Sequence, residues 1–146
     1  MLAGAVGLAA LGGCSSPAAV RVAVPDGPAA GCVRLHDALP ASVGGRDARD
    51  VTPASRRTAA WGSPAVTLRC GVTRPPGLRS TAQLVVVDGV GWYLRSDDPP
   101  WVFTAVSRVT YVEVRVPAAV PRDEATAPLA DLAGALKQAL PPRAAP

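Results

Sequence analysis

The sequence predicts an α+β domain in which a mostly antiparallel sheet of four to six strands carries two helices packed on one face. Segments of alternating apolar and polar residues, typical of strands, fill much of residues 65–116. Apolar residues at helical spacing flank this region, at residues 32–39 and 128–140. A length of 146 residues, without visible internal repeats, indicates a single domain with one modest core.

The first residues resemble a secretion signal. Residues 1–13 contain no charge and only small or aliphatic side chains, as in the apolar part of a signal peptide. Residues 11–14 (LGGC) have the pattern of a lipobox, a small-residue cleavage site that ends in a cysteine destined for a diacylglyceride. We therefore expect residues 1–13 to be removed and Cys14 to be lipidated. Acyl chains would then anchor the protein in the cell membrane, on its extracytoplasmic face.

Two other interpretations of this segment stay open. No Lys or Arg precedes the apolar run, although signal peptides begin with a basic region, so we expect translation to start upstream of Met1. A longer start would allow an N-terminal transmembrane helix, which needs about 20 apolar residues. A plain cleaved signal is the other alternative.

The composition of the remaining chain indicates three parts: a tether, a single domain and a tail. Residues 14–31 comprise the lipidated cysteine and a flexible tether, which the abundance of Ser, Pro, Ala and Gly in residues 15–31 predicts. Alternation at residues 20–24 adds a short edge strand within it. Residues 32–140 form the single domain, and residues 141–146, which begin with two prolines, form a disordered tail.

The elements of the domain follow in order. Residues 32–39 predict a helix ended by Pro40, and the polar, Gly- and Pro-containing residues 41–60 predict a loop with one short strand near residues 49–52. Alternation predicts a strand at residues 65–72. The Asp-Gly pair at 88–89 then predicts a hairpin between residues 81–87 and 90–95.

Two further strands and a helix complete the expected domain. Residues 101–106 and 109–116 predict another hairpin, which ends at a Pro-containing segment, residues 117–121. Pro128 opens a helix whose apolar stripe consists of Leu129, Leu132, Ala133, Leu136 and Leu140.

Two cysteines remain once Cys14 carries lipid. In an oxidising compartment we expect Cys32 and Cys70 to form a disulfide, because strand alternation places Cys70 on the core side, where the helix bearing Cys32 packs. Closing a loop of this length would stabilise the fold by about 4 kcal/mol. The alternative is two buried free thiols in a protein that never leaves the cytoplasm.

Composition argues against several functional classes. The net charge of +4 is spread along the chain, whereas nucleic-acid binders cluster their basic residues and interleave aromatics; we expect no nucleic-acid partner. The chain has one histidine, His36, and no CxxC pair, so no zinc site is expected. The Gly-Gly pairs lack the frame of a phosphate loop, and we expect no cofactor.

The candidate binding surface is the sheet face opposite the helices. Strand alternation directs four side chains to it, with Glu113 near Arg69: Arg69, Tyr111, Glu113 and Arg115. We expect an uncovered polar and aromatic face without a deep pocket. This face or the loop 41–60 is expected to engage an envelope protein or a cell-wall component. The alternative role is a cross-strand ion pair on an open face, worth about 0.2–1 kcal/mol.

Catalytic residues are few. Only His36 could act as the base of a nucleophile, and it lies about 40° from Cys32 on a helical wheel, at the border of the buried face. Ser63 lacks the flanking glycines of a nucleophile elbow. No catalytic residue is therefore assigned, and the second functional hypothesis, a small envelope hydrolase, requires His36 or Glu113 to line a concave cleft.

The three tryptophans differ in expected environment. Trp61 and Trp92 are expected to be core anchors, because the chain has few other aromatic residues. Trp101 follows Pro99-Pro100 at the start of a strand and is expected to be the most exposed.

Several blocks of the chain resemble an actinobacterial family of exported proteins called domain of unknown function 3515. The blocks occur in order over about residues 20 to 140 and comprise residues 32–40, 60–72, 87–92 and 111–117. In the family an acidic residue often stands at the positions of Ser63 and Gly91. The resemblance implies an N-terminal signal or membrane segment and thus an exported protein. It implies no biochemical activity, because none is assigned to the family.

Overall fold

The computed structural model describes residues 12–13 and 15–144 of the chain. Residues 1–11 and Cys14 lie outside this description, and with them most of the expected signal peptide and the expected lipidation site. Within the described ranges, no helix combines the length and the apolar character that crossing a bilayer requires.

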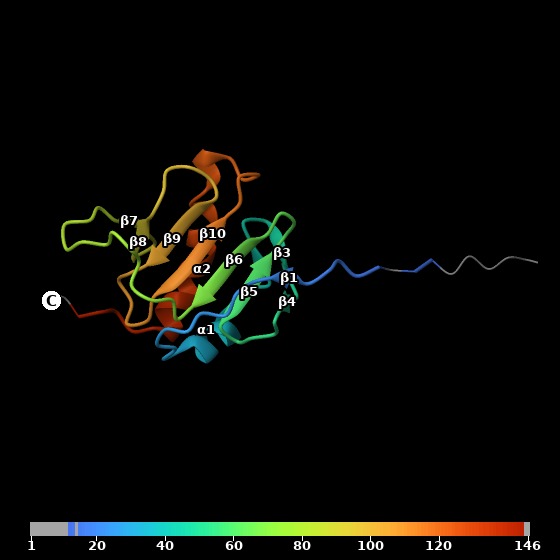
Figure 1. The fold of residues 1–146 in the computed structure, drawn as a ribbon, viewed down its shortest axis with the longest axis horizontal. Helices are drawn as coiled ribbons and strands as arrows, with labels where there is room; N and C mark the ends of the chain where they lie inside the picture. Colours follow the sequence, from blue (N-terminus) through green and yellow to red (C-terminus); the bar gives the residue numbers. More distant parts are fainter. Residues whose placement is uncertain (1–11, 14, 145–146) are drawn as a thin grey trace, which may run out of the picture.

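An eight-stranded antiparallel sheet forms the centre of the molecule (Figure 1). Its strands are, in spatial order, β2 (Ser42–Val43), β3 (Arg46–Arg49), β5 (Thr58–Trp61), β6 (Val66–Cys70), β10 (Val112–Val116), β9 (Trp101–Ala105), β8 (Val90–Leu94) and β7 (Val85–Val87). Two more strands, β1 (Val20–Arg21) and β4 (Val51–Thr52), form a separate parallel pair. The α+β class is confirmed, whereas the expected four to six strands were an undercount.

The additional strands lie in the segment expected to be mainly loop. Residues 41–60 contain β2, β3 and β4 and most of β5. These strands are two to four residues long, too short and too polar to show an alternating pattern. Their partners define them: Ala48 of β3 pairs with Trp61 of β5, and Val51 of β4 pairs with Val20 of β1.

The hairpin at Asp88-Gly89 forms as expected. Asp88 has a φ of 47° and Gly89 a φ of 81°, the two positive values that a tight two-residue hairpin turn requires. Val87 of β7 pairs with Val90 of β8 directly across this turn. The first strand is shorter than expected, because β7 begins at Val85 rather than at residue 81.

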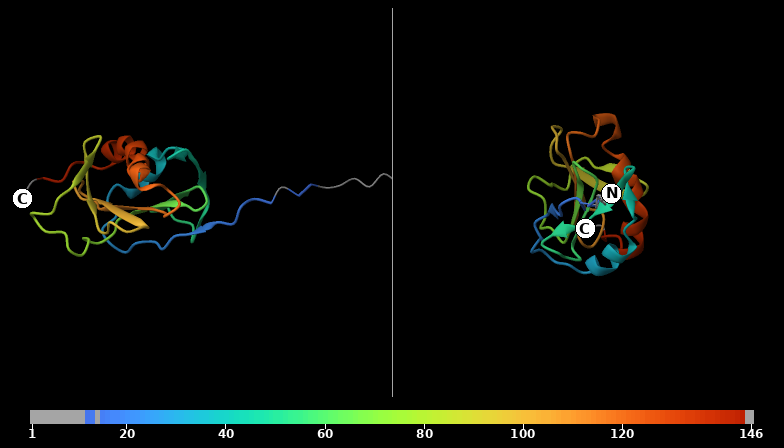
Figure 2. Two further views of the ribbon diagram at one scale, coloured as in Figure 1. Left: turned by 90° about the horizontal axis from the view of Figure 1, so that it is seen from above. Right: turned by 90° about the vertical axis from the view of Figure 1, so that its right-hand side faces the viewer.

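The two expected helices are α1 (Cys32–Ala38) and α2 (Ala127–Ala139), and a short 3₁₀ helix, η1 (Arg122–Glu124), precedes α2. The helices contact each other on one side of the sheet (Figure 2). Every residue of the expected stripe is buried: Leu129, Leu132, Ala133, Leu136 and Leu140. The core therefore lies between the helices and one sheet face, as the apolar periodicity predicts.

A disulfide joins the helical layer to the sheet. Cys32, the first residue of α1, is bonded to Cys70, the last residue of β6, and their Cα atoms are 5.7 Å apart. Both side chains belong to the buried core. The expected pairing is confirmed, and it fixes α1 against the middle of the sheet.

The sheet face opposite the helices is partly covered by the chain that leads into α1 (Figure 2). Three carbonyl groups of this segment accept hydrogen bonds from side chains of the domain: Ala23 from Arg69, Gly27 from Arg57 and Ala30 from Thr110. Residues 20–30 were expected to be part of a flexible tether, but they are packed on the domain. Alternation within a strand cannot reveal this cover, because it comes from a distant segment.

Burial of the tryptophans follows the expectation in two cases of three. Trp61 and Trp92 are 1% and 0% exposed and belong to the core. Trp101, expected to be exposed, is only 6% exposed. The expectation was wrong because all five residues of β9 are buried, although a proline-rich loop precedes the strand.

The beginning of the expected disordered tail is ordered. The carbonyl of Pro141 accepts a hydrogen bond from the Val109 amide, and the Arg143 amide donates one to Ser107. The Arg143 guanidinium also lies 4.4 Å from the centre of the Tyr111 ring. Residues 141–143 therefore pack against the segment between β9 and β10, while residues 145–146 lie outside the description.

Candidate functional site

The structure brings only part of the expected binding face together. Arg69 and Glu113 are directly opposite each other on β6 and β10, with Arg69 Nη1 3.2 Å from Glu113 Oε1. Arg115 is exposed further along β10, and Tyr111 is half-buried beside Arg143. The four residues therefore differ in environment: Arg69 and Glu113 form a contacting pair, Arg115 is exposed, and Tyr111 lies against Arg143.

The expected open face is instead a small polar cleft. Glu113 is 8% exposed, and the cleft around it, about 190 Å³ in volume, is lined by Arg69 and Thr104 from the sheet and by Pro25 and Asp26 from the covering segment. The Arg69 side chain also donates to the Ala23 carbonyl at 2.9 Å. The Arg69–Glu113 pair thus holds the covering segment on the sheet, and the expectation of an uncovered face was wrong.

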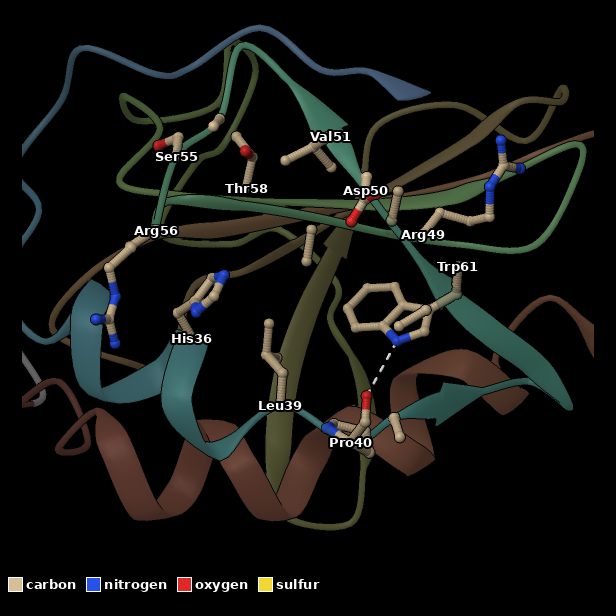
Figure 3. A pocket seen from close by; sticks show the side chains of 15 residues that line it. His36, Leu39, Pro40, Arg49, Asp50, Val51, Ser55, Arg56, Thr58 and Trp61 are labelled. Carbon is tan, nitrogen blue, oxygen red and sulfur yellow. Dashed lines mark hydrogen bonds between the residues drawn. The ribbon is translucent and has the colours of Figure 1, made fainter. Parts of the chain in front are cut away.

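A larger cavity lies at the other end of the sheet, between α1 and the strands β3, β4 and β5 (Figure 3). Its volume is about 810 Å³. One wall is the end of α1 with His36 and Leu39, and the other is the segment from Ala48 to Ser55, while Trp61 lies between them. We call this space the α1 cavity.

Apolar groups line most of the α1 cavity. The Trp61 ring is almost fully buried, and its indole nitrogen donates to the Pro40 carbonyl at 3.0 Å. Leu39 and Val51 line the cavity on the side of the ring, as Figure 3 shows, and Ala48, which pairs with Trp61 across β3 and β5, lines it as well. Because the indole N–H is already used, this part of the cavity offers a ligand mainly apolar contact.

Polar side chains lie at both ends of the cavity, with Arg49 and Asp50 on the Trp61 side and a larger group at the other end. His36, Ser55, Arg56 and Thr58 lie there, contributed by α1, by the segment after β4 and by β5 (Figure 3). Arg56 forms an ion pair with Asp37. The Thr58 hydroxyl is different, because the residue is 1% exposed and its oxygen has no hydrogen-bond partner among the described residues.

Two structural links hold the walls in place. The disulfide at Cys32 lies one helical turn before His36 and so fixes the α1 wall. On the opposite wall, the Arg49 guanidinium donates to the Gly62 carbonyl at 2.8 Å and to the Ala18 carbonyl at 2.5 Å. The second of these bonds places the chain that leads back toward Cys14 directly beside the cavity.

His36 meets the geometric condition set for a hydrolase, since it lines a concave site. Glu113 meets it as well in the small polar cleft. Among the described residues, however, no hydrogen bond joins the His36 ring to a hydroxyl, and the Ser55 hydroxyl accepts a bond from the Arg57 amide. The described part of the chain also holds no group of three or more metal-binding side chains.

The α1 cavity was not predicted from the sequence. Its strand wall comes from residues 41–60, expected to be mainly a loop, although this segment was named as an interaction surface. The proximity of His36 to the buried face of its helix was the one local signal. The other residues meet only through sheet pairing, which local pattern does not encode.

Comparison with known proteins assigns the chain to a family. The family model described as "Protein of unknown function (DUF3515)" matches residues 1–145. The chain belongs to this family. No curated protein sequence and no solved structure is similar to it at a significant level. Membership in DUF3515 confirms the family resemblance of the sequence blocks and supplies no activity.

Proposed function

We propose that this DUF3515 protein is a non-enzymatic binding module of the cell envelope, anchored through lipid on Cys14 at the outer side of the cytoplasmic membrane, and that its ligand occupies the α1 cavity. The cavity volume of about 810 Å³ lies within the roughly 300–1,000 Å³ typical of small-molecule sites, which are mostly apolar with a few placed polar groups.

The Thr58 hydroxyl is the observation that carries the proposal. A hydroxyl buried without a partner costs about 1–3 kcal/mol, and Thr58 is 1% exposed with its oxygen unpaired. The Thr58 oxygen is enclosed at this end of the cavity, so a polar atom of a ligand would supply the missing hydrogen bond once the side chain turns toward the cavity. The apolar contacts around Trp61 would hold the remainder of the ligand.

The proposed location is supported by the two kinds of cysteine in the chain. The pattern that ends at Cys14 is that of a lipidation site. The Cys32–Cys70 disulfide is typical of proteins that fold in an oxidising compartment. Residues 15–19 contain no helix or strand and connect Cys14 to β1, as a short tether would.

Binding in the α1 cavity is testable with an apolar fluorescent probe, anilinonaphthalene sulfonate. We expect the probe to bind the folded protein and to accept excitation energy from Trp61. Ala48 is exposed, pairs with Trp61 and lines the cavity, so Ala48→Phe should fill the space and abolish binding. Ala130→Phe, on the exposed side of α2, is the matched control. Equal binding by both variants would contradict the proposed site.

Anchoring is testable in cells with an alkyne-labelled palmitate. We expect the wild-type chain to incorporate the label and to sediment with membranes. Cys14→Ser should lose the label and leave the membrane fraction. An unlabelled wild-type protein that retains its leader would contradict the lipid anchor.

A small envelope hydrolase is the second candidate, because His36 and Ser55 line the same cavity. A hydrolase would turn over an activated ester such as p-nitrophenyl acetate, and His36→Gln would abolish the turnover. Identical slow rates for the wild type and this variant would eliminate the candidate.

A further inference from the structure

We infer that the ligand of the α1 cavity is an acyl chain of a membrane lipid, with the lipid's polar group at the Thr58 end. The inference rests on the proposed function, because it assigns a ligand class to the same cavity. It draws on two features of the structure, the separation of polar and apolar groups along the cavity and the position of the tether.

The distribution of side chains along the cavity matches an amphipathic ligand. Leu39, Ala48 and Trp61 provide an apolar surface in which the indole N–H is already bonded to the Pro40 carbonyl. Most of the hydrogen-bonding groups lie at the other end, where Thr58 has an unpaired hydroxyl and His36 lines the wall. Arg49 and Asp50 line the Trp61 side, where the Arg49 guanidinium is bonded to the Gly62 and Ala18 carbonyls. A uniformly polar ligand, such as a sugar, would leave its own polar groups unpaired against the apolar part, which is unfavourable.

The tether brings the cavity close to a lipid surface. The Arg49 side chain, which lines the cavity, is bonded to the Ala18 carbonyl at 2.5 Å. Val51, also in the lining, pairs with Val20 of β1. Cys14 is four residues before Ala18, a span of at most about 14 Å for an extended chain. If Cys14 is anchored, the cavity wall lies within that distance of the anchored residue.

Proximity of this kind favours ligands of the bilayer over ligands in solution. A tether of a few residues confines the domain near the lipid and raises the effective concentration of lipid at the cavity. An acyl chain that leaves the bilayer would exchange one apolar environment for another, while its polar group would gain the Thr58 hydroxyl. Apolar lining, an unpaired buried hydroxyl and a neighbouring membrane attachment therefore indicate the same class of ligand.

The inference is testable by quenching with bromine. The full chain carrying Cys14→Ser, which excludes an acyl group of its own, is mixed with phosphatidylglycerol vesicles whose acyl chains are dibrominated. Bromine quenches an indole that it contacts, so we expect a saturable loss of Trp61 fluorescence. Trp61→Phe should remove most of this loss, and Ala48→Phe should weaken binding at least about tenfold, equivalent to roughly 1.4 kcal/mol. Ala130→Phe should behave like the parent chain.

Thr58→Val provides a second readout that a purely structural role would not give. The substitution keeps the shape and removes a buried unpaired hydroxyl, so the melting temperature should stay the same or rise. Affinity for the vesicles should nevertheless fall about three- to tenfold, because the bond to the polar group of the lipid is lost. Unchanged affinity would contradict the assigned orientation.

The outcomes separate the ligand class from the proposed binding function. Binding of anilinonaphthalene sulfonate that depends on Ala48, without quenching by brominated lipid, would overturn the lipid assignment and leave the cavity as a ligand site. Absence of both signals would overturn both. Quenching that persists in Trp61→Phe would place the lipid elsewhere and also overturn the assignment.

Discussion

Removing the disulfide should destabilise the protein by an amount that depends on the length of the loop that the disulfide closes. Cys32 and Cys70 are 38 positions apart. A crosslink that closes a loop of this size lowers the entropy of the unfolded chain by about 13 cal/mol/K, which corresponds to about 4 kcal/mol at 25 °C. The double variant Cys32→Ala/Cys70→Ala should therefore lose about 4 kcal/mol of unfolding free energy.

Urea denaturation followed by circular dichroism is the appropriate assay. We expect a lower midpoint and a steeper dependence on urea, because the unfolded chain without its crosslink exposes more surface. The melting temperature of a domain of this size should fall by about 12–20 °C, from roughly 3–5 °C per kcal/mol. Treating the wild-type protein with a reductant should reproduce these changes and is the control for the lost sulfur atoms.

The variant without the disulfide should also bind less well in the α1 cavity. The disulfide lies one turn from His36 and fixes α1, which forms one wall of the cavity. Probe binding should therefore weaken in the reduced protein even at temperatures where the domain remains folded. A melting temperature within about 3 °C of the wild type, together with unchanged probe binding, would refute this role of the crosslink.

Two further predictions concern single residues. Glu113→Ala should lower the unfolding free energy by about 1–3 kcal/mol, because the buried carboxylate holds Arg69. The control, Arg115→Ala on the exposed part of β10, should change it by less than about 0.5 kcal/mol. Equal urea midpoints for the two variants would show that the Arg69–Glu113 pair is not structural. Gly71 has a φ of 88°, and an added Cβ would overlap a nitrogen of the Arg57 side chain, so Gly71→Ala should cost at least about 1–2 kcal/mol. Gly134→Ala, in a helix with no atom within 4 Å of the new Cβ, should instead stabilise by about 0.5–1 kcal/mol. Thermal melts that move in the same direction for both glycine variants would contradict this distinction.

Local chemistry accounts for the parts of the fold that the sequence predicts correctly. The Asp88-Gly89 turn, the apolar stripe of α2 and the alternation in β6 each depend on neighbouring residues. The disulfide follows from the same alternation, since it directs Cys70 toward α1. In these elements the conformational preference of the local sequence and the packing of the folded domain favour the same structure.

Long-range contacts account for the parts that could not be predicted. The strands β2, β3 and β4 are defined by their partners rather than by their own composition. Trp101 follows a loop-like sequence, yet β9 is buried along its whole length. Arg69 and Glu113 were correctly placed beside each other, but the cover over them comes from Ala23 and its neighbours, more than 40 residues away in sequence.

The α1 cavity belongs to this second class. His36 and Thr58 come from separate elements and lie at one end of the cavity only after the sheet and helix have packed. An unpaired buried hydroxyl is also invisible in a sequence, because it depends on which acceptors the fold places nearby. The family match could not supply the site, since the family has no assigned function.

Native mass spectrometry of the full-length protein, extracted from its own membranes in a mild detergent, tests most directly whether the α1 cavity holds a ligand. We expect a protein mass with one additional bound molecule of lipid mass in the wild type and in Ala130→Phe, and the protein mass alone in Ala48→Phe. Detection of the protein mass alone in all three, at equal folding stability, would contradict the existence of a ligand in the cavity.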